Sequence, residues 1–183
     1  MSQIRIHTDP LQAPPSVDDY TWDQWVPGVK ATLVFVKQRE KVLLIEKKRG
    51  LGKGKVNAPG GKCEADESWE ECASRELVEE VNIKGNNLQR VAVLHFLMSD
   101  YPDILCHVFM THDFMGTAEE SDEAFPFWCH VDDIPYDQMW EDDQYWLPRV
   151  LAGEKVKCYF SLKGEKLCSQ KIVSISSWEN SIL

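Results

Sequence analysis

The sequence predicts an α/β fold of the α+β kind, with a mixed β-sheet between helices. Short runs rich in β-branched and aromatic residues alternate with turn residues, as strands do. One longer segment repeats its apolar residues every three to four positions, as an amphipathic helix does. With 183 residues, of which 43% are hydrophobic and 10% aromatic, the chain is long enough for one domain with a sizeable core.

The first part of the chain differs in composition from the rest. Residues 1–27 are rich in Pro, Asp and short polar residues, so we expect an N-terminal extension, followed by the domain at residues 28–183. Trp22 and Trp25 indicate that the end of this extension packs back onto the domain. The alternative is a mobile tail that carries two aromatic contact residues.

The first half of the domain reads as a β-hairpin, a glycine-containing loop and a helix. Strands are expected at residues 31–36 and 41–48, joined by a turn near residues 38–40. Three glycines between residues 50 and 54 mark a flexible loop. The helix is expected at about residues 68–81, with Asp66 as its N-cap.

The second half reads mainly as strands, after a polar linker at residues 84–87. Strands are expected at 90–98, 104–112, 125–131, 157–162 and 166–175. Pro126 favours an edge position or a bulge in its strand. Residues 140–153 read as a loop that leads into a helix closed by Gly153. The last two strands flank Gly164 and are expected to form a hairpin.

The charge pattern limits the class of partner. The net charge is −10, and the cluster Lys47-Lys48-Arg49 stands alone, which argues against a surface for a DNA or RNA polymer. A nucleotide whose phosphates arrive with a metal ion remains compatible. No apolar run approaches the length of a membrane span, and the first residues lack a signal-peptide core. We therefore expect a cytoplasmic protein, and a monomer rather than an oligomer.

The six cysteines are scattered and include no C-x-x-C pair, so reduced thiols are expected. Cys106-His107 and Cys129-His130 suggest a zinc site at first. Adjacent residues on a strand point to opposite faces, however, so neither pair is expected to share a metal from one side.

Residues 61–83 carry the most informative pattern. Glu76, Glu79 and Glu80 stand three and four positions apart on the expected helix, so their carboxylates share one side. The apolar residues fall on another side: Trp69, Cys72, Ala73, Leu77 and Val81. Because like charges at this spacing repel, a cation is expected among them, and hard oxygen ligands suit Mg²⁺ or Mn²⁺. The alternative is a solvated acidic helix surface.

The spacing of this segment resembles the Nudix box, the signature of a hydrolase family. The matching positions are Gly61, Glu67, Arg75-Glu76-Leu77, Glu79-Glu80 and Asn82-Ile83. The family usually has glycine where this chain has Asn82. Asparagine tolerates the left-handed conformation that such a glycine adopts, so we expect the departure to be harmless. The resemblance implies the Nudix α/β/α sandwich with its mixed sheet and its loop and helix.

The resemblance also implies roles for residues of the box. Glu76, Glu79 and Glu80, with Gly60, would ligate one or more Mg²⁺ ions. Gly60 and Gly61 would bring the backbone close to the phosphates or the metal. Arg75 would act structurally, paired with an acidic residue such as Glu67. Glu120 would assist the metal or the water, unless it belongs to a solvated acidic loop. The general base varies within the family and is left open.

Beyond the box, about residues 29–175 resemble the animal-type MutT homologues, which are 8-oxo-dGTP diphosphatases. The shared stretches are Lys47–Gly50, Gly54–Asn57, Gly60–Lys62, Glu120–Glu123, Asp133–Pro135 and Met139–Trp146. This resemblance implies that a nucleoside triphosphate is split to monophosphate and pyrophosphate. Asn57, Trp140, Asp142 and Asp143 would line the base pocket. Lys47 would contact phosphate unless it is merely an exposed charge at a strand end.

The chemistry of these pocket residues suits an oxidised purine. Trp140 offers a face for stacking, and Asn57 supplies a donor and an acceptor. Two adjacent buried aspartates should not both ionise, so Asp142 and Asp143 can present one acceptor and one donor. That pair matches the N7–H and O6 edge of 8-oxoguanine, and a shifted proton would admit oxidised adenine such as 2-hydroxy-dATP. The alternative is that Asp143 N-caps a helix starting near Gln144.

The apolar part of the pocket departs from these relatives. Leu51 stands where they have an aromatic residue near the base, Ala58-Pro59 replaces a Gly-Phe pair, and His95 and Leu97 replace phenylalanines. A different oxidised or alkylated purine could therefore be preferred. The alternatives are a Nudix enzyme for a plain dNTP, a nucleotide sugar or ADP-ribose, and a non-catalytic Nudix protein that binds a ligand.

Overall fold

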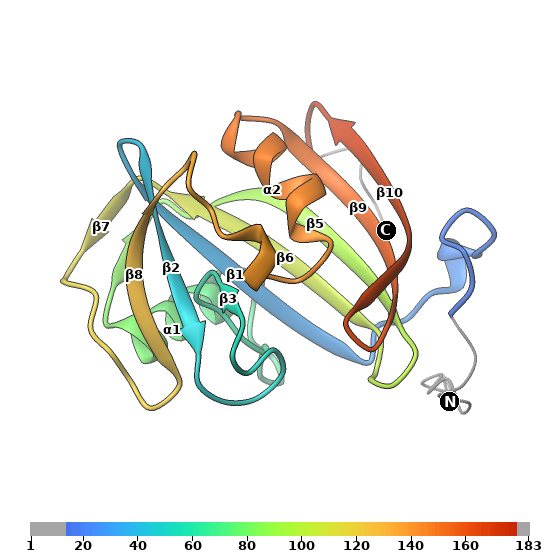
Figure 1. Ribbon diagram of the computed structural model, residues 1–183, viewed down its shortest axis with the longest axis horizontal. Coiled ribbons are helices and arrows are strands. Elements are labelled where there is room, and N and C mark those ends of the chain that lie inside the picture. The colour runs from blue at the N-terminus through green and yellow to red at the C-terminus, as the bar shows by residue number, and fades with distance from the viewer. Residues whose placement is uncertain (1–13, 179–183) are drawn as a thin grey trace. The chain divides into compact units, whose positions relative to one another are not determined.

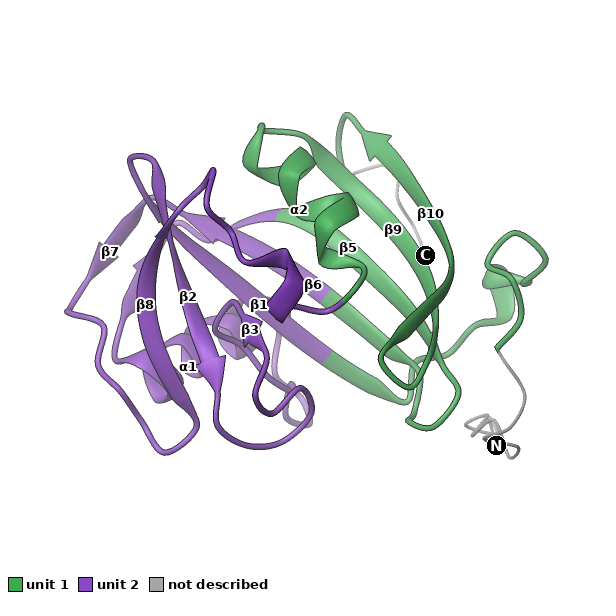
Figure 2. Ribbon diagram, viewed as in Figure 1, with its two compact units in different colours: residues 1–30, 91–106, 141–183 green, residues 31–90, 107–140 purple. Residues whose placement is uncertain are grey.

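The computed structural model describes residues 14–178 and divides the chain into two compact units (Figure 2). Unit 1 comprises residues 1–30, 91–106 and 141–183, and unit 2 comprises residues 31–90 and 107–140. The strands are β1 (Val29–Gln38), β2 (Lys41–Lys47), β3 (Val56–Asn57), β4 (Lys84–Asn86), β5 (Gln89–Met98), β6 (Ile104–Thr111), β7 (Asp113–Met115), β8 (Ala124–His130), β9 (Lys155–Lys163) and β10 (Lys166–Ile175). The α-helices are α1 (Trp69–Val81) and α2 (Asp143–Leu151), and two 3₁₀ helices are η1 (Trp22–Gln24) and η2 (Tyr136–Gln138).

In unit 2, β2 pairs antiparallel with β1, β3 and β8 (Figure 1). The pairing of β2 with β8 runs from Lys41 opposite His130 to Lys47 opposite Ala124. Within the described chain, β2 is the sole strand partner of β8. Pro126 therefore lies in an edge strand, as predicted. The register also sets residues 118–123, which precede β8, beside the end of β2.

The prediction of a polar linker at residues 84–87 was partly wrong. Lys84–Asn86 forms β4 and pairs antiparallel with β7. Neither strand shows in the sequence, because three residues are too few to display alternation and the two segments lie far apart in the chain. The predicted longer strands are all present, with ends that differ by one or two residues.

The core of unit 2 lies between its strands and α1. Buried residues of the strands and of the helix form one cluster: Val34, Val36, Leu43, Ile45, Ala73, Leu77, Val81, Ile83, Phe109 and Ala124. The apolar side predicted for α1 is the side that packs, with Cys72 also buried and Trp69 partly buried against the cluster. Burial of this side fixes which residues of α1 face outward.

Both ends of α1 have defined caps. The N-cap is Ser68 and not Asp66, as the sequence had suggested, because Ser68 and Glu71 form a capping box by accepting from each other's backbone N–H groups. Asp66 lies in the preceding turn with a positive φ of 66°. Asn82 ends the helix in the left-handed conformation, with φ 56° and ψ 29°. The left-handed conformation expected at Asn82 is therefore present, whereas the harmlessness of the departure from glycine stays a prediction.

In unit 1, β9 pairs antiparallel with β10 and parallel with β5, so this part of the sheet is mixed. The β9–β10 connection is the expected hairpin, with Gly164 at a φ of 60°. Helix α2 packs against β9 and is followed by Gly153 at a φ of 95°. The expected α/β class, a mixed sheet with two α-helices, is confirmed.

The segment before β1 packs onto other parts of unit 1. The Trp22 ring lies 4.5 Å from that of Tyr159, centroid to centroid. The Trp25 indole Nε1 donates to Asp103 Oδ2 at 2.9 Å. The expectation that the two tryptophans pack back is confirmed, whereas the boundary at residue 27 stays a prediction. No helix within residues 14–178 has both the length and the apolar character needed to cross a membrane.

Candidate functional site

The two glycines before α1 lie against the helix carboxylates. Gly60 has a φ of 151°, and a Cβ there would stand 2.1 Å from the backbone oxygen of Thr32. A Cβ at Gly61 would stand 2.5 Å from Oε2 of Glu76. Both positions therefore need glycine, one for the backbone and the other for the space that a carboxylate fills.

Glu80 is the most deeply buried carboxylate of α1, with its side chain 1% exposed. Its Oε2 accepts from the Gly60 N–H at 2.8 Å, and its Oε1 lies 3.0 Å from Lys47 Nζ. The alternative of a solvated acidic surface is wrong for Glu80, because a buried charge persists only with partners of this kind. Lys47 is likewise not a merely exposed strand-end charge, since its side chain is 17% exposed and paired.

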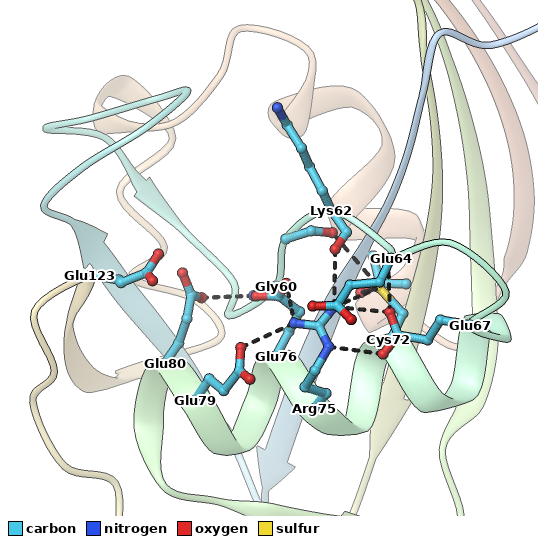
Figure 3. A network of polar contacts seen from close by, with 12 residues as sticks. Gly60, Lys62, Glu64, Glu67, Cys72, Arg75, Glu76, Glu79, Glu80 and Glu123 are labelled. Atoms are coloured by element: carbon cyan, nitrogen blue, oxygen red, sulfur yellow. Dashed lines mark hydrogen bonds and ion pairs between the residues drawn. The ribbon is translucent and has the colours of Figure 1, made fainter.

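Arg75 connects the remaining carboxylates (Figure 3). Its Nε and Nη2 donate to the two oxygens of Glu67 at 2.8 and 2.9 Å. Its Nη1 donates to Glu76 at 2.8 Å and to Glu79 at 3.0 Å. The expected pair of Arg75 with Glu67 is present. Glu71, also four residues from Arg75, takes part in the capping box instead.

This arrangement shifts the pKa values of two carboxyl groups in opposite directions. The hydrogen bonds from Arg75, and next from the Glu64 N–H, lower the pKa of Glu67 to about 2. Burial raises the pKa of Glu76; Arg75 opposes the rise, and the nearby charges of Glu80 and Glu79 add to it. Glu76 thus lies where a further positive charge would stabilise its ionised form.

The charge balance of this group fits a divalent cation. Four carboxylates (Glu67, Glu76, Glu79 and Glu80) contact two cationic side chains (Arg75 and Lys47), which leaves an excess of two negative charges. All of the donor atoms offered are hard oxygens, which suit Mg²⁺ or Mn²⁺ better than softer metals. Figure 3 shows the four carboxylates and Arg75 along one flank of α1 beside Gly60. The residues present therefore fit such an ion.

The rest of the basic cluster is neutralised by the loop before β8. Lys48 Nζ lies 2.5 Å from Glu120 Oε1, and Arg49 pairs with Glu123. Glu120 is 54% exposed, whereas Glu123 lies near Glu80 (Figure 3). Glu123 and Lys48 were not predicted as site residues from the sequence. The sequence feature that could have revealed them is the opposite charge of two segments about 70 residues apart. The pairing of β2 with β8 brings these segments together.

Trp140 follows η2 in unit 2 and contacts the glycine-containing loop. A Cβ at Gly52 would stand 3.1 Å from its Nε1. Lys55 Nζ lies 5.2 Å from the centroid of its ring, within cation–π range. Lys55 was missed by sequence reasoning. Leu51 in the same loop is 41% exposed, and Asn57 in β3 accepts from the Ala58 N–H at 2.8 Å.

Asp142 and Asp143 lie in unit 1 and are both buried, at 2% and 3% exposed. The N-cap alternative for Asp143 is wrong, because Asp143 is already the first residue of α2 and Asp142 holds the N-cap position. The Asp142 side chain makes no capping hydrogen bond, and its Oδ2 accepts from Trp146 Nε1 at 3.2 Å. Its Oδ1 is buried and finds no hydrogen-bond partner among residues 14–178. Burial raises the pKa of Asp142.

This chain is similar in sequence and in structure to known proteins. The NUDIX domain family profile matches residues 26–150. The oxidized purine nucleoside triphosphate hydrolase of Danio rerio is 39% identical over 134 residues, which cover 73% of this chain and 86% of that protein. The Mus musculus protein of the same name is 38% identical over 135 residues, again covering 73% and 86%. The solved structure of a MutT protein from Bacillus halodurans matches with a TM-score of 0.69 at 24% identity, covering 79% of this chain and 97% of that chain.

Proposed function

Because this chain belongs to the NUDIX family of hydrolases, we propose that it hydrolyses oxidised purine nucleoside triphosphates to monophosphate and pyrophosphate. 8-oxo-dGTP and 2-hydroxy-dATP are the substrates expected, and their removal would sanitise the nucleotide pool. Nudix hydrolases act on small-molecule nucleotides and generally use divalent metal ions. The main observation behind the proposal is that Asp142 is buried and that its Oδ1 lacks a hydrogen-bond partner in the described chain. Asp142 follows Trp140 by two residues, and the chain is similar to hydrolases of this kind.

In this proposal the carboxylates of α1 hold the metal. Glu76, Glu79 and Glu80, with the carbonyl of Gly60, would ligate Mg²⁺, with Mn²⁺ as an alternative. The bound ion supplies charge neutralisation and acidifies a water molecule. Arg75 orients Glu76 and Glu79 by donating to both, and the Gly60 N–H orients Glu80. Lys47, beside Glu80, supplies a positive charge for a phosphate oxygen.

The base would be recognised by a second group of residues. Trp140 offers a ring face, and Asn57 an amide donor. Asp142 and Asp143 would share one proton, so that one carboxyl donates to a base acceptor and the other accepts from the N–H of an oxidised purine; burial raises the pKa of Asp142. Lys55 over the Trp140 ring holds that ring in place. Glu120 would assist the metal or the water from its loop.

A substrate panel tests the proposal. We expect kcat/KM for 8-oxo-dGTP or 2-hydroxy-dATP to exceed that for dGTP by about tenfold or more in Mg²⁺, since a site with buried polar groups rejects a base that cannot pair with them. O6-methyl-dGTP and ADP-ribose complete the panel. If oxidised purines are no better than dGTP, the sanitising role is contradicted and only the hydrolase class remains.

Two variants test the metal site within the same experiment. Glu80→Gln should lower kcat by roughly 100-fold, as expected when a group acting on transition-state charge is removed. Glu70→Gln, an exposed glutamate of the same helix, is the matched control and should keep wild-type turnover. Equal turnover of wild type and Glu80→Gln would contradict the assignment of Glu80 as a metal ligand.

The cellular setting is also part of this proposal. We place the protein in the cytoplasm, because six free thiols suit a reducing compartment. We also propose that the protein is a monomer rather than an oligomer. Analytical ultracentrifugation would distinguish this monomer from a dimer.

A further inference from the structure

Two thiols and a carboxylate come together just before and at the start of α1. The Sγ atoms of Cys63 and Cys72 and a carboxylate oxygen of Glu67 lie within 4.8 Å of one another. Cys72 is on the buried side of α1, whereas Cys63 is only partly buried. Figure 3 shows Cys72 and Glu67 next to Arg75, at the opposite end of the network from Glu80. This group is separate from the residues assigned to Mg²⁺.

Two of the three potential ligands, Glu67 and Cys72, have hydrogen-bond partners. The Glu67 carboxylate accepts from Arg75 and from the Glu64 N–H, which lies 2.9 Å from Oε2. Cys72 Sγ lies 3.3 Å from Thr32 Oγ1, where either atom can donate, and accepts from Arg75 Nη2 at 4.0 Å. Outer hydrogen bonds of this kind hold first-shell ligands in place in metal sites.

The surface beside the group favours the approach of a cation. An open depression of about 620 Å³ is lined by five acidic residues, Glu64, Asp66, Glu67, Glu70 and Glu71, and by one cationic residue, Arg75. The acidic lining raises the local concentration of positive ions. Cys63, being partly exposed, leaves one side of the group accessible.

We propose that Cys63, Cys72 and Glu67 form a binding site for a thiophilic divalent cation, with Zn²⁺ as the natural occupant. Two sulfur ligands select Zn²⁺ against Mg²⁺, and one carboxylate completes three protein ligands, with water in the fourth position. Binding replaces the two thiol protons, which are released to solvent as two thiolate–metal bonds form. The site shares no ligand with the Mg²⁺ site, and Arg75, which donates to Glu67 as well as to Glu76 and Glu79, lies between the two.

The test is direct metal binding to the full-length chain. The protein is stripped with a chelator, kept reduced with a phosphine, and titrated with Zn²⁺ against a chromophoric chelator in excess Mg²⁺. We expect one Zn²⁺ per chain and two protons released. With Co²⁺ as a probe, we expect a thiolate-to-metal charge-transfer band, which oxygen ligands alone do not produce.

Cysteine variants identify the ligands. Cys63→Ser removes a partly exposed ligand and should weaken Zn²⁺ binding by about tenfold or more and reduce the cobalt band. Cys72→Ser is the second ligand variant. Cys168→Ser removes an exposed thiol of β10 and is the matched control, which should bind Zn²⁺ as wild type does. The proposal is overturned if Cys63→Ser binds Zn²⁺ as tightly as the control, or if the charge-transfer band is absent.

Discussion

Gly60 and Gly61 are adjacent, yet a side chain would meet a different obstacle at each. At Gly60 the added atom would meet the main chain of Thr32 and Leu33, and the backbone has a positive φ. At Gly61 it would meet the end of the Glu76 side chain, with no such constraint on φ. A main chain cannot move aside, whereas a carboxylate can rotate away. The two positions therefore separate fold stability from site geometry.

We predict that Gly61→Ala displaces the Glu76 carboxylate and lowers kcat by about tenfold or more, with little change in Tm. Gly60→Ala should instead lower stability by on the order of 1–3 kcal/mol, because it combines backbone strain with a collision. Kinetics in Mg²⁺ and thermal unfolding of both variants make the comparison. Gly85→Ala is the control for turnover, because its added atom would lie 3.0–3.3 Å from side-chain methyl groups and meets no carboxylate. Wild-type kcat in Gly61→Ala would show that Glu76 need not stay where it is.

At the scale of elements, α1 shows how a helix end depends on one residue type. Asn82 has a left-handed backbone, and its N–H donates to the carbonyls of Leu77 and Val78. Glycine and asparagine tolerate this conformation, whereas a Cβ without a polar group makes it costly. The departure from the usual glycine of the family is thus a change of side chain and not of conformation.

We predict that Asn82→Ala lowers the free energy of unfolding by about 1 kcal/mol, and that Asn82→Gly leaves it unchanged or slightly higher. Urea unfolding monitored by tryptophan fluorescence measures both. The pair controls for loss of the amide, since both variants remove it. Equal stability of the two variants would mean that the left-handed backbone at this position carries no cost.

On the scale of the whole molecule, the segment before β1 buries a titratable group. His95 stacks on Tyr159 at 4.6 Å and lies 5.2 Å from the Trp25 ring, centroid to centroid. Its Nδ1 lies 3.0 Å from the Cys158 carbonyl oxygen, to which it donates. Burial lowers the pKa of His95 from 6.5 to about 4; the hydrogen bond opposes the shift, and Lys157 adds to it. His95 is therefore neutral in the folded chain at neutral pH.

This burial predicts an acid-sensitive stability. Between pH 6.5 and about 4 the unfolded chain binds a proton at His95 that the folded chain does not. The contribution is therefore fully present above pH 6.5 and is lost as the pH falls towards 4. His95→Phe should show a smaller fall of Tm over this window than wild type. The exposed His112→Gln is the control, and identical Tm profiles for wild type and His95→Phe would contradict the prediction.

The longer strands, α1, its apolar side and the set of box residues could be predicted from the sequence, because periodicity and spacing are local properties of the chain. It also favoured the left-handed end at Asn82, because that preference resides in one side chain. The N-cap was less certain, since Asp66 and Ser68 are both good candidates and only the turn geometry selects Ser68. The short strands β4 and β7 were missed, because their pairing depends on distant residues.

The partner of each charged side chain could be known only from the tertiary fold. Glu76, Glu79 and Glu80 look equivalent in sequence, yet Glu80 is buried against Lys47 and the Gly60 N–H, while Glu76 and Glu79 share Arg75. The approach of Cys63 to Cys72 and Glu67 was equally hidden. Burial and long-range pairing depend on which segments the fold brings together. The pKa of a carboxyl group or thiol depends on that environment as well as on the residue type.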